Sequence, residues 1–433
     1  MAIDLNFAGQ RTAYGTHGVH SFAAKFPPQL ARWGIESFSE AGETVLDPMV
    51  GSGTTLVEAR LLGRHGLGVD IDPLARLIAA VKSTPLPTDV LAAATRHLLV
   101  DAGADFADLR LAREYGIPFR DAFRDIPIPE FPNRDYWFMP KVSEELALLR
   151  RRLDRIDPKP IRDFFYVVFS STIITKSSSS VANVRDLAHS RPHFATPRVQ
   201  PDVLRAFVTR LARMTRAMND LTEGCASPSS ARIIGDDARR LALADRSVDL
   251  IFTSPPYVNA IDYPRAHKFS LFWLGDALGT STDAYRDLGR SYIGTDRVPI
   301  KTCHALTRER FGIASLDATI ERLAEADPRR AGVASRYFDD MGRALSEMGR
   351  VLRPGRQAVI VVCPSRIADV NVATHDLLAE LAEARTSGVL RHVETHERTL
   401  DDSRRQLPIT RGRFGPGMRT EFVVVLRRDA ASL

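Results

Sequence analysis

The sequence has only three cysteines in 433 residues, Cys225, Cys303 and Cys363, and no two of them form a CxxC pair. This scarcity argues against a disulfide framework and against a cysteine-rich zinc site, so we interpret the cysteines as structural residues of a protein in a reducing compartment. The histidines also lack carboxylate or cysteine partners at ligand spacing. No metal site is predicted.

Long apolar runs are missing as well. The longest uncharged, mainly apolar run covers residues 164–175 and falls well short of the ~20 residues that a membrane helix needs, so it is interpreted as a buried core segment. Asp4 and Arg11 interrupt the N-terminal stretch, where a signal peptide would need an unbroken apolar core. We therefore predict a cytoplasmic protein that has no membrane partner.

Lysine is scarce too, because only seven of the 59 basic residues are lysines and the rest are arginines. Arginine makes bidentate contacts with phosphates and guanine edges, but a codon bias that also raises the alanine content would give the same surplus. With 53 acidic residues the net charge is +6, which permits a polyanionic partner without requiring one. The content of 44% hydrophobic and 26% charged residues is that of a globular protein.

Strand and helix patterns alternate over residues 43–83. A short apolar run at 44–46 is followed by a glycine turn at 51–53 that leads into a helix, and a second strand at 66–71 leads into another helix. Repeated units of this kind form a parallel, doubly wound sheet. The sequence therefore predicts an α/β fold.

The chain length allows two or three domains of roughly 150 residues, or one large domain with insertions. The strand pattern stops between residues 85 and 228, where helical spacing dominates, and it resumes with runs such as 248–253 and 420–427. We therefore predict one sheet domain made of residues 1–84 and 229–433, interrupted by the helical insertion 85–228.

The first chemical signal is the sequence DPxxGSGTT at residues 47–55, where the first strand turns into a helix. Glycines let the backbone approach a ligand closely, and the N-terminus of the helix offers unpaired N–H groups. Asp70, at the end of the next strand, can accept both hydroxyls of a ribose. A dinucleotide site and a plain tight turn also fit the glycines, whereas a P-loop does not, because Gly-Lys-Ser/Thr is absent.

The second signal is TSPPY at residues 253–257, at the end of an apolar strand. Two consecutive prolines cannot continue a ladder of hydrogen bonds, so the chain leaves the sheet as a stiff extended segment. Carbonyl oxygens and the Ser254 hydroxyl can accept hydrogen bonds there from the exocyclic amine of a nucleobase, and Tyr257 can stack on the base. The alternative is a Pro-Pro strand end with Tyr257 as an ordinary packed aromatic.

Together the two motifs resemble those of the S-adenosylmethionine-dependent DNA amino-methyltransferase family, whose catalytic motif is Ser/Asp/Asn-Pro-Pro-Tyr/Phe. The resemblance extends over residues 15–83 and 231–427. It implies a Rossmann-like class I methyltransferase sheet, mostly parallel with an antiparallel last strand, in which residues 1–84 form the cofactor-binding half and residues 229–433 the catalytic half. The implied cofactor is S-adenosylmethionine, and no metal is implied.

The resemblance also assigns roles to individual residues. The segment at residues 20–30 is similar to the piece that closes over the cofactor in this family, and Asp237, rather than Asp236, is expected to border the adenine. The implied cofactor-binding residues are Phe26, Pro27, Asp47, Pro48, Gly51, Gly53, Thr54, Asp70 and Asp237. The implied catalytic residues are Ser254, Pro255, Pro256 and Tyr257.

Serine at the first position of this motif is more typical of cytosine-N4 enzymes than of adenine-N6 enzymes. The resemblance therefore implies a site-specific enzyme that methylates the N4 amine of cytosine in double-stranded DNA by direct in-line attack, with adenine-N6 methylation as the near alternative. Cytosine-C5 methylation is disfavoured, because it needs a cysteine after a proline and Cys363 precedes Pro364. An RNA base methyltransferase and an inactive DNA-binding module are further alternatives, and the intact motifs argue against the second of them.

The order of the motifs is permuted relative to many SPPY enzymes, because the cofactor motif comes first here. Candidates for target recognition are the insertion 85–228, the arginine-rich stretch 273–328 and the basic stretch 403–415. A base inside duplex DNA must also be flipped out to reach such a site. A cognate restriction endonuclease, in a restriction–modification system, is the protein partner that this enzyme class suggests.

Overall fold

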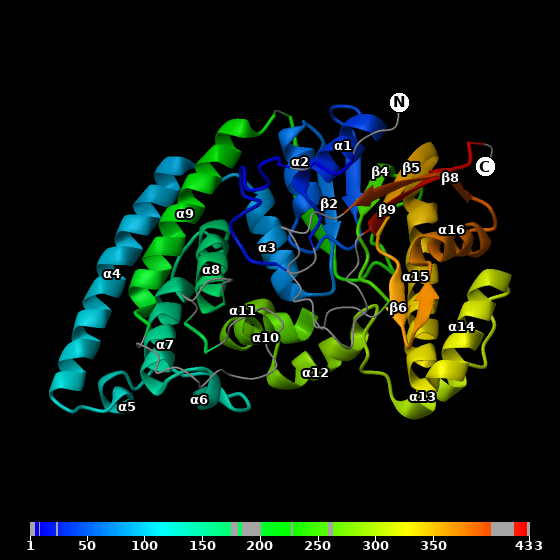
Figure 1. Ribbon diagram of the computed structural model, residues 1–433. Coiled ribbons are helices and arrows are strands. Elements are labelled where there is room, and N and C mark those ends of the chain that lie inside the picture. Colours follow the sequence, from blue (N-terminus) through cyan, green and yellow to red (C-terminus); the bar gives the residue numbers. More distant parts are fainter. Residues whose placement is uncertain are drawn as a thin grey trace.

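The computed structural model describes residues 5–7, 9–22, 25–174, 181–183, 201–226, 228–258, 263–399 and 420–430. In this part of the chain a seven-stranded sheet has the order β3-β2-β1-β4-β5-β9-β8. The strands from β3 to β5 are parallel, and β9 lies antiparallel between β5 and β8 (Figure 1). The prediction of a mostly parallel sheet with an antiparallel last strand is confirmed. The strands are β1 Thr44–Asp47, β2 His65–Val69, β3 Ser230–Gly235, β4 Val248–Thr253, β5 Leu352–Val362, β8 Leu390–Thr399 and β9 Thr420–Arg428, and β6 Ser365–Ile367 pairs with β7 Val370–Val372 in a separate hairpin.

Helices cover both faces of this sheet. Successive strand residues point to opposite faces, so that Val45 packs in the cluster under α1 and α2, while Leu46 packs in the cluster under α15 and α16. This alternation explains why the central strands read as continuous apolar runs, since both of their faces are buried. The covering helices are α1 Pro28–Phe38 and α2 Thr54–Leu61 on one face, and α14 Ala314–Ala326, α15 Pro328–Val351 and α16 Thr374–Arg385 on the other, with α13 Ile300–Leu306 against α15.

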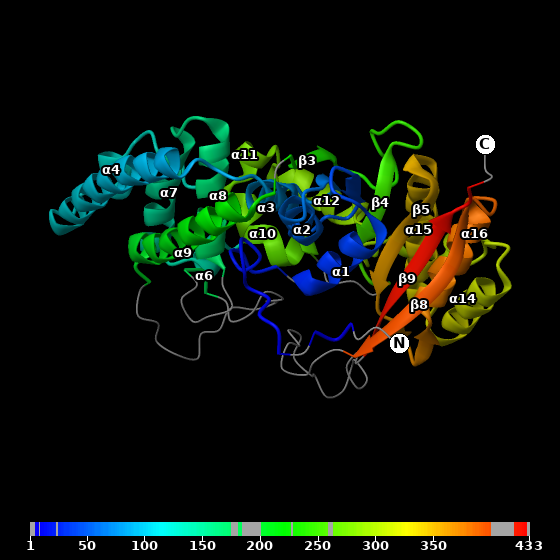
Figure 2. The same ribbon diagram turned by 90° about the horizontal axis from the view of Figure 1, so that it is seen from above.

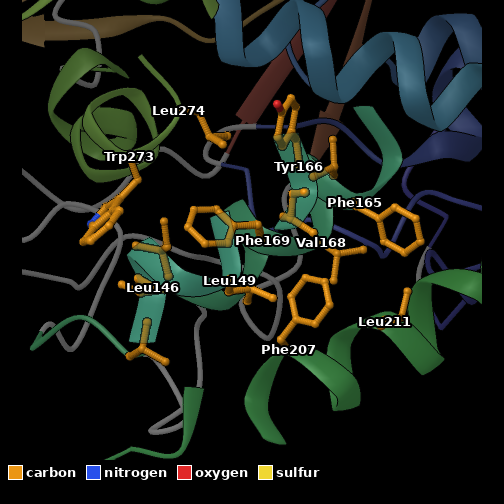
Figure 3. Close-up of a cluster of buried hydrophobic side chains, with 14 of the residues drawn as sticks. Leu146, Leu149, Phe165, Tyr166, Val168, Phe169, Phe207, Leu211, Trp273 and Leu274 are labelled. Carbon is orange, nitrogen blue, oxygen red and sulfur yellow. The ribbon is translucent and has the colours of Figure 1, made fainter. Parts of the chain in front are cut away.

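A group of helices extends from one end of the sheet (Figures 1 and 2). Its core is one apolar cluster, in which Phe165 and Phe169 of α8 meet Phe207 of α9 and Trp273 of α10 (Figure 3). The same cluster includes Leu74 of α3, so the insertion is packed onto the sheet domain through a shared core. The helices of the insertion are α4 Thr88–Glu114, α5 Phe119–Ala122, α6 Arg134–Trp137, α7 Pro140–Asp154, α8 Lys159–Ile173 and α9 Val203–Gly224. The helices outside the insertion at this end of the molecule are α3 Pro73–Ser83, which contacts β2 and β3, and α10 Tyr263–Trp273, α11 Gly275–Leu278 and α12 Thr282–Ser291, which follow β4.

The apolar run at residues 164–175 forms most of α8, and its residues 164–173 are buried. The prediction of a buried core segment is therefore confirmed over those residues. Within the described residues, no helix combines the length and the apolar character needed to cross a membrane. The basic stretch 403–415 lies outside the described residues.

Candidate active site

A cavity of about 850 Å³, including its mouth, opens at the carboxyl ends of four neighbouring parallel strands. Residues that directly follow β1, β2, β3 and β4 line it, and the N-terminal segment before α1 closes one side. Ligands of open α/β sheets bind at this edge. The cavity brings together nine of the predicted site residues, which are Phe26, Asp47, Pro48, Gly51, Thr54, Asp70, Asp237, Ser254 and Pro256. Pro27, Gly53, Pro255 and Tyr257 are not among the residues that line it.

The glycine turn between β1 and α2 has two residues with positive φ, Gly51 at 47° and Gly53 at 80°. A side chain at Gly53 would place its Cβ only 2.8 Å from the Cα of Ala79 in α3, so this glycine permits close helix packing. At Gly51 the Cβ would lie 3.3 Å from the Phe22 ring, at the cavity wall. The two glycines thus have different tasks, because only Gly51 borders the ligand space.

Asp47 ends β1 and ties three segments together. Its carboxylate accepts hydrogen bonds from the Thr55 hydroxyl and the Thr253 hydroxyl, each at 2.7 Å, and from the Met49 backbone N–H at 3.1 Å. Burial raises the pKa of Asp47 to about 6 in spite of these bonds. Because Thr253 ends β4, Asp47 fixes the start of the TSPPY segment relative to the glycine turn.

Asp70 follows β2 and braces the same turn from the other side. One carboxylate oxygen accepts from the Gly51 N–H at 2.8 Å, and the other accepts from the Asp72 N–H at 2.9 Å. Burial, together with the nearby charge of Asp72, raises the pKa of Asp70 to about 7. A carboxylate held in this way at the cavity wall can accept hydrogen bonds from the hydroxyls of a bound ribose.

Asp72 links the cavity to α10. It caps α3 by accepting from the Leu74 N–H at 2.8 Å, and it also pairs with the His267 ring. Burial alone would raise the pKa of Asp72, but His267 holds it below its ordinary value. The ring of His267 lies 4.9 Å from the ring of Phe22, so α10 supports the aromatic wall of the cavity.

Asp237 follows β3 and is held by a neighbouring arginine. The Arg239 guanidinium donates to both carboxylate oxygens, at 2.9 and 3.0 Å, and the Arg239 backbone N–H adds a third bond at 2.9 Å. The same guanidinium reaches Asp340 of α15 at 2.8 Å. Burial alone would raise the pKa of Asp237, but Arg239 keeps this pKa below its ordinary value. Asp237 is therefore charged at pH 7, while Asp236 is exposed beside it.

The N-terminal segment is anchored on a buried carboxylate. Glu58 of α2 bonds to the Tyr14 hydroxyl at 2.6 Å and to the His17 ring at 2.7 Å, and it pairs with Arg32 at 2.9 Å. Burial lowers the pKa of His17 to about 4, so its ring is neutral at pH 7. Lys25 donates to the His17 carbonyl at 2.8 Å and lines the cavity. The segment thus brings a cation to the cavity wall.

The SPPY segment divides between two environments. Ser254 and Pro256 line the cavity, whereas the Tyr257 hydroxyl oxygen lies 3.4 Å from the Cys363 sulfur, next to the end of β5. Burial raises the pKa of Cys363 to about 12, so this thiol is protonated at pH 7 and is a poor nucleophile. This agrees with the structural role predicted for the cysteine.

Several cavity residues carry no sequence signal of their own. Tyr292 follows α12 and reaches the cavity from a segment distant in sequence from its motifs, whereas Tyr263, which begins α10, comes shortly after the SPPY motif. Lys25 and Arg239 also line the cavity, close to the predicted residues Phe26 and Asp237. In the described part of the chain, no group of three or more His, Cys, Asp and Glu side chains is arranged to hold a metal ion.

The sheet order, with the antiparallel strand β9 between β5 and β8 and a cavity at the carboxyl edge of the parallel strands, is that of the Rossmann-like class I methyltransferase fold. A family model described as DNA methylase, for N6 and N4 enzymes, matches residues 6–80. Over this segment the chain is similar to the DNA amino-methyltransferase family, and S-adenosylmethionine is the methyl donor that this similarity implies.

Individual relatives are similar over long stretches. The Type II methyltransferase M.MvaI of Kocuria varians is 24% identical over an alignment of 396 residues that covers 87% of this chain and 83% of that protein. The Type II methyltransferase M.MjaII of Methanocaldococcus jannaschii is 23% identical over 346 residues, covering 62% of this chain and 64% of that protein. A solved S-adenosylmethionine-dependent methyltransferase of Methanosarcina mazei has 10% identity and a TM-score of 0.30, covering 91% and 96% of the two chains.

Proposed function

We propose that the protein is a site-specific methyltransferase that forms N4-methylcytosine in double-stranded DNA. The observation that carries this proposal is the position of Ser254, which lines the cavity directly after β4 and is the first residue of the SPPY motif. A neutral hydroxyl, rather than a carboxylate, therefore faces the target amine. Adenine-N6 methylation is the competing outcome of the test below.

The chemistry of the cavity wall fits S-adenosylmethionine. Asp70 offers carboxylate oxygens to the ribose hydroxyls, and Asp237 offers them to the adenine amine. Lys25 supplies a cation for the carboxylate of the methionine part, beside the glycine turn. When bound there, the cofactor supplies an electrophilic methyl group on a sulfonium.

The residues of the motif prepare the target amine for direct attack. The lone pair of an exocyclic amine is delocalised into the base, and hydrogen bonds from the amine to Ser254 and to nearby carbonyl oxygens favour its tetrahedral form. The two prolines keep these acceptors stiff, because each fixes its own φ angle. Tyr257 stacks on the base and sets its plane. No covalent intermediate with the protein is needed.

Target recognition is assigned in this proposal to the helical insertion at residues 85–228, and base flipping brings the cytosine to the cavity. Arg213 of α9 supports this assignment, because it is exposed and donates to the carbonyl of Gly18 in the N-terminal segment that closes the cavity. Because the relatives are named Type II methyltransferases, we also infer a cognate restriction endonuclease as a partner.

The nature of the product tests the proposal. Purified protein is incubated with S-adenosylmethionine and plasmid DNA from a host that lacks DNA methyltransferases, and the DNA is digested to nucleosides for mass spectrometry. We expect N4-methylcytosine, formed equally well in EDTA. N6-methyladenine would move the assignment to the adenine enzymes, 5-methylcytosine would contradict the amine mechanism, and loss of activity in EDTA would contradict the metal-free one.

Lys25→Met is expected to weaken S-adenosylmethionine binding about tenfold, because one charge-assisted hydrogen bond to the cofactor carboxylate is lost. Calorimetry measures the Kd. Binding of methylthioadenosine, which has no carboxylate, should not change, and Lys159→Met, at an exposed lysine, should leave both affinities unchanged. Equal weakening of both ligands would show that Lys25 does not contact the carboxylate.

A further inference from the structure

Four polar residues lie in a row along one edge of the sheet. Tyr257 follows β4, Cys363 follows β5, Glu421 lies at the start of β9, and Arg398 lies near the end of β8. The strands have the spatial order β4-β5-β9-β8, and the antiparallel direction of β9 brings its first residues to the same edge as the last residues of β5 and β8. The row begins at the last residue of the catalytic motif.

Neighbouring members of this row are in contact. The Cys363 sulfur lies 3.4 Å from the Tyr257 hydroxyl oxygen and 3.9 Å from Oε1 of Glu421. Because the thiol has a single proton, it donates that proton to the Glu421 carboxylate and accepts a hydrogen bond from the Tyr257 hydroxyl. Arg398 Nη1 lies 3.4 Å from Oε2 of Glu421, and these two residues are also direct partners in the β8–β9 ladder. The contacts therefore run without interruption from the motif to the far edge strand.

Three members of the row are buried, and burying their polar and charged groups lowers the free energy of unfolding. The exposed fractions are 1% for Cys363, 5% for Glu421 and 4% for Arg398. Burying an ion pair removes the hydration of both charges, and the attraction between the charges offsets this cost only poorly. Apolar side chains of similar size at the same positions often give equal or better stability. A gain in stability is thus a weak explanation for these residues, whereas a defined position for the Tyr257 hydroxyl is a direct consequence of them.

We propose that Cys363, Glu421 and Arg398 are positioning residues that hold the ring of Tyr257 through its hydroxyl, so that the ring meets the flipped base at a fixed angle. This inference rests on the proposed function, because it needs a base that stacks on Tyr257. Arg398 orients the carboxylate of Glu421, this carboxylate accepts the S–H proton of Cys363, and the sulfur accepts the hydrogen bond that fixes the Tyr257 hydroxyl. With its backbone set by two prolines and its hydroxyl bonded, the ring has little freedom to turn.

A double-mutant cycle tests the row on the full-length protein. Tyr257→Phe keeps the aromatic ring and removes the hydroxyl, while Cys363→Ala keeps the Tyr257 hydroxyl and removes the sulfur that it contacts. We expect each change to lower kcat/KM for DNA about threefold to tenfold, which corresponds to one hydrogen bond, and the double variant to lose no more than either single one. Cys363→Ser should restore most of the loss, because a serine hydroxyl can likewise donate one hydrogen bond and accept another. The Kd for S-adenosylmethionine should stay constant in all variants.

Matched controls separate positioning from general damage. Cys303→Ala and Tyr337→Phe remove the same groups from buried sites away from the row, in α13 and α15, and should leave kcat/KM unchanged. Glu421→Gln should lower kcat/KM to the same extent as Cys363→Ala. Independent losses that multiply in the double variant, or a parallel loss of cofactor affinity, would overturn the positioning role. A wild-type protein that transfers no methyl group to DNA would instead overturn the proposed function, and the inference with it.

Discussion

Tyr257→Ala is expected to lower kcat for methyl transfer to DNA by about 100-fold, while the Kd for S-adenosylmethionine stays within about twofold. The ring is the one large flat surface in the SPPY motif, and loss of stacking and of base orientation reduces rates by this order. Cofactor binding should be preserved, because Tyr257 is not among the residues that line the cavity. Transfer of labelled methyl groups gives kcat, and calorimetry gives the Kd.

Tyr115→Ala is a suitable control for this prediction. Tyr115 follows α4 and is 73% exposed, so its removal should change neither quantity. Full activity of Tyr257→Ala would show that the ring does not stack on the target base. A loss of cofactor affinity as large as the loss of kcat would place Tyr257 in the cofactor site instead.

The first half of the sheet could be predicted because its signals are local. The turn at residues 51–53 separates a strand from a helix, and the alternation at residues 43–83 repeats this unit. The order of the strands was less accessible, because β3 is paired with β2 across a long insertion. Nothing in the spacing of residues 85–228 shows that their helices share a core with α3 and α10, since that depends on tertiary packing.

In the candidate site, too, some residues could be predicted from the sequence and others could not. Residues that directly follow strands, such as Asp70 and Ser254, could be found because parallel strands end at one edge of a sheet. Tyr292 could not be found, because it approaches the cavity from a separate helix and no local pattern marks it. Gly53 was assigned to the cofactor for its place in the motif, and the structure gives it a packing contact with Ala79.

Asp70→Asn is expected to raise the Kd for S-adenosylmethionine about 100-fold. The carboxylate accepts two backbone N–H groups, from Gly51 and Asp72, and an amide would turn its NH₂ group toward one of these donors. It would also lose the charge that makes hydrogen bonds to ribose hydroxyls strong. Calorimetry measures the affinity. Asp89→Asn, at an exposed carboxylate of α4 that does not line the cavity, should change the Kd less than about twofold, and an equal effect there would contradict a specific role of Asp70.

The pH dependence of binding gives a second test of Asp70. Its pKa lies at about 7 in the free protein, so a growing fraction is protonated below that pH and must lose the proton to accept two hydroxyls. Cofactor affinity should therefore fall as the pH drops from about 7.5 to about 5.5, and Asp70→Asn should abolish this slope. The contribution of Asp70 to the stability of the free protein has the opposite sign: its pKa is raised on folding, so this contribution to the free energy of unfolding falls as the pH rises from about 4 to 7. It is measured as the difference between the wild type and Asp70→Asn, because the buried rings of His17 and His20, whose pKa values are lowered to about 4 and 3, contribute a slope of the other sign in both proteins. A cofactor affinity that stays constant from about pH 7.5 to about 5.5 would show that Asp70 does not bind the cofactor as a carboxylate.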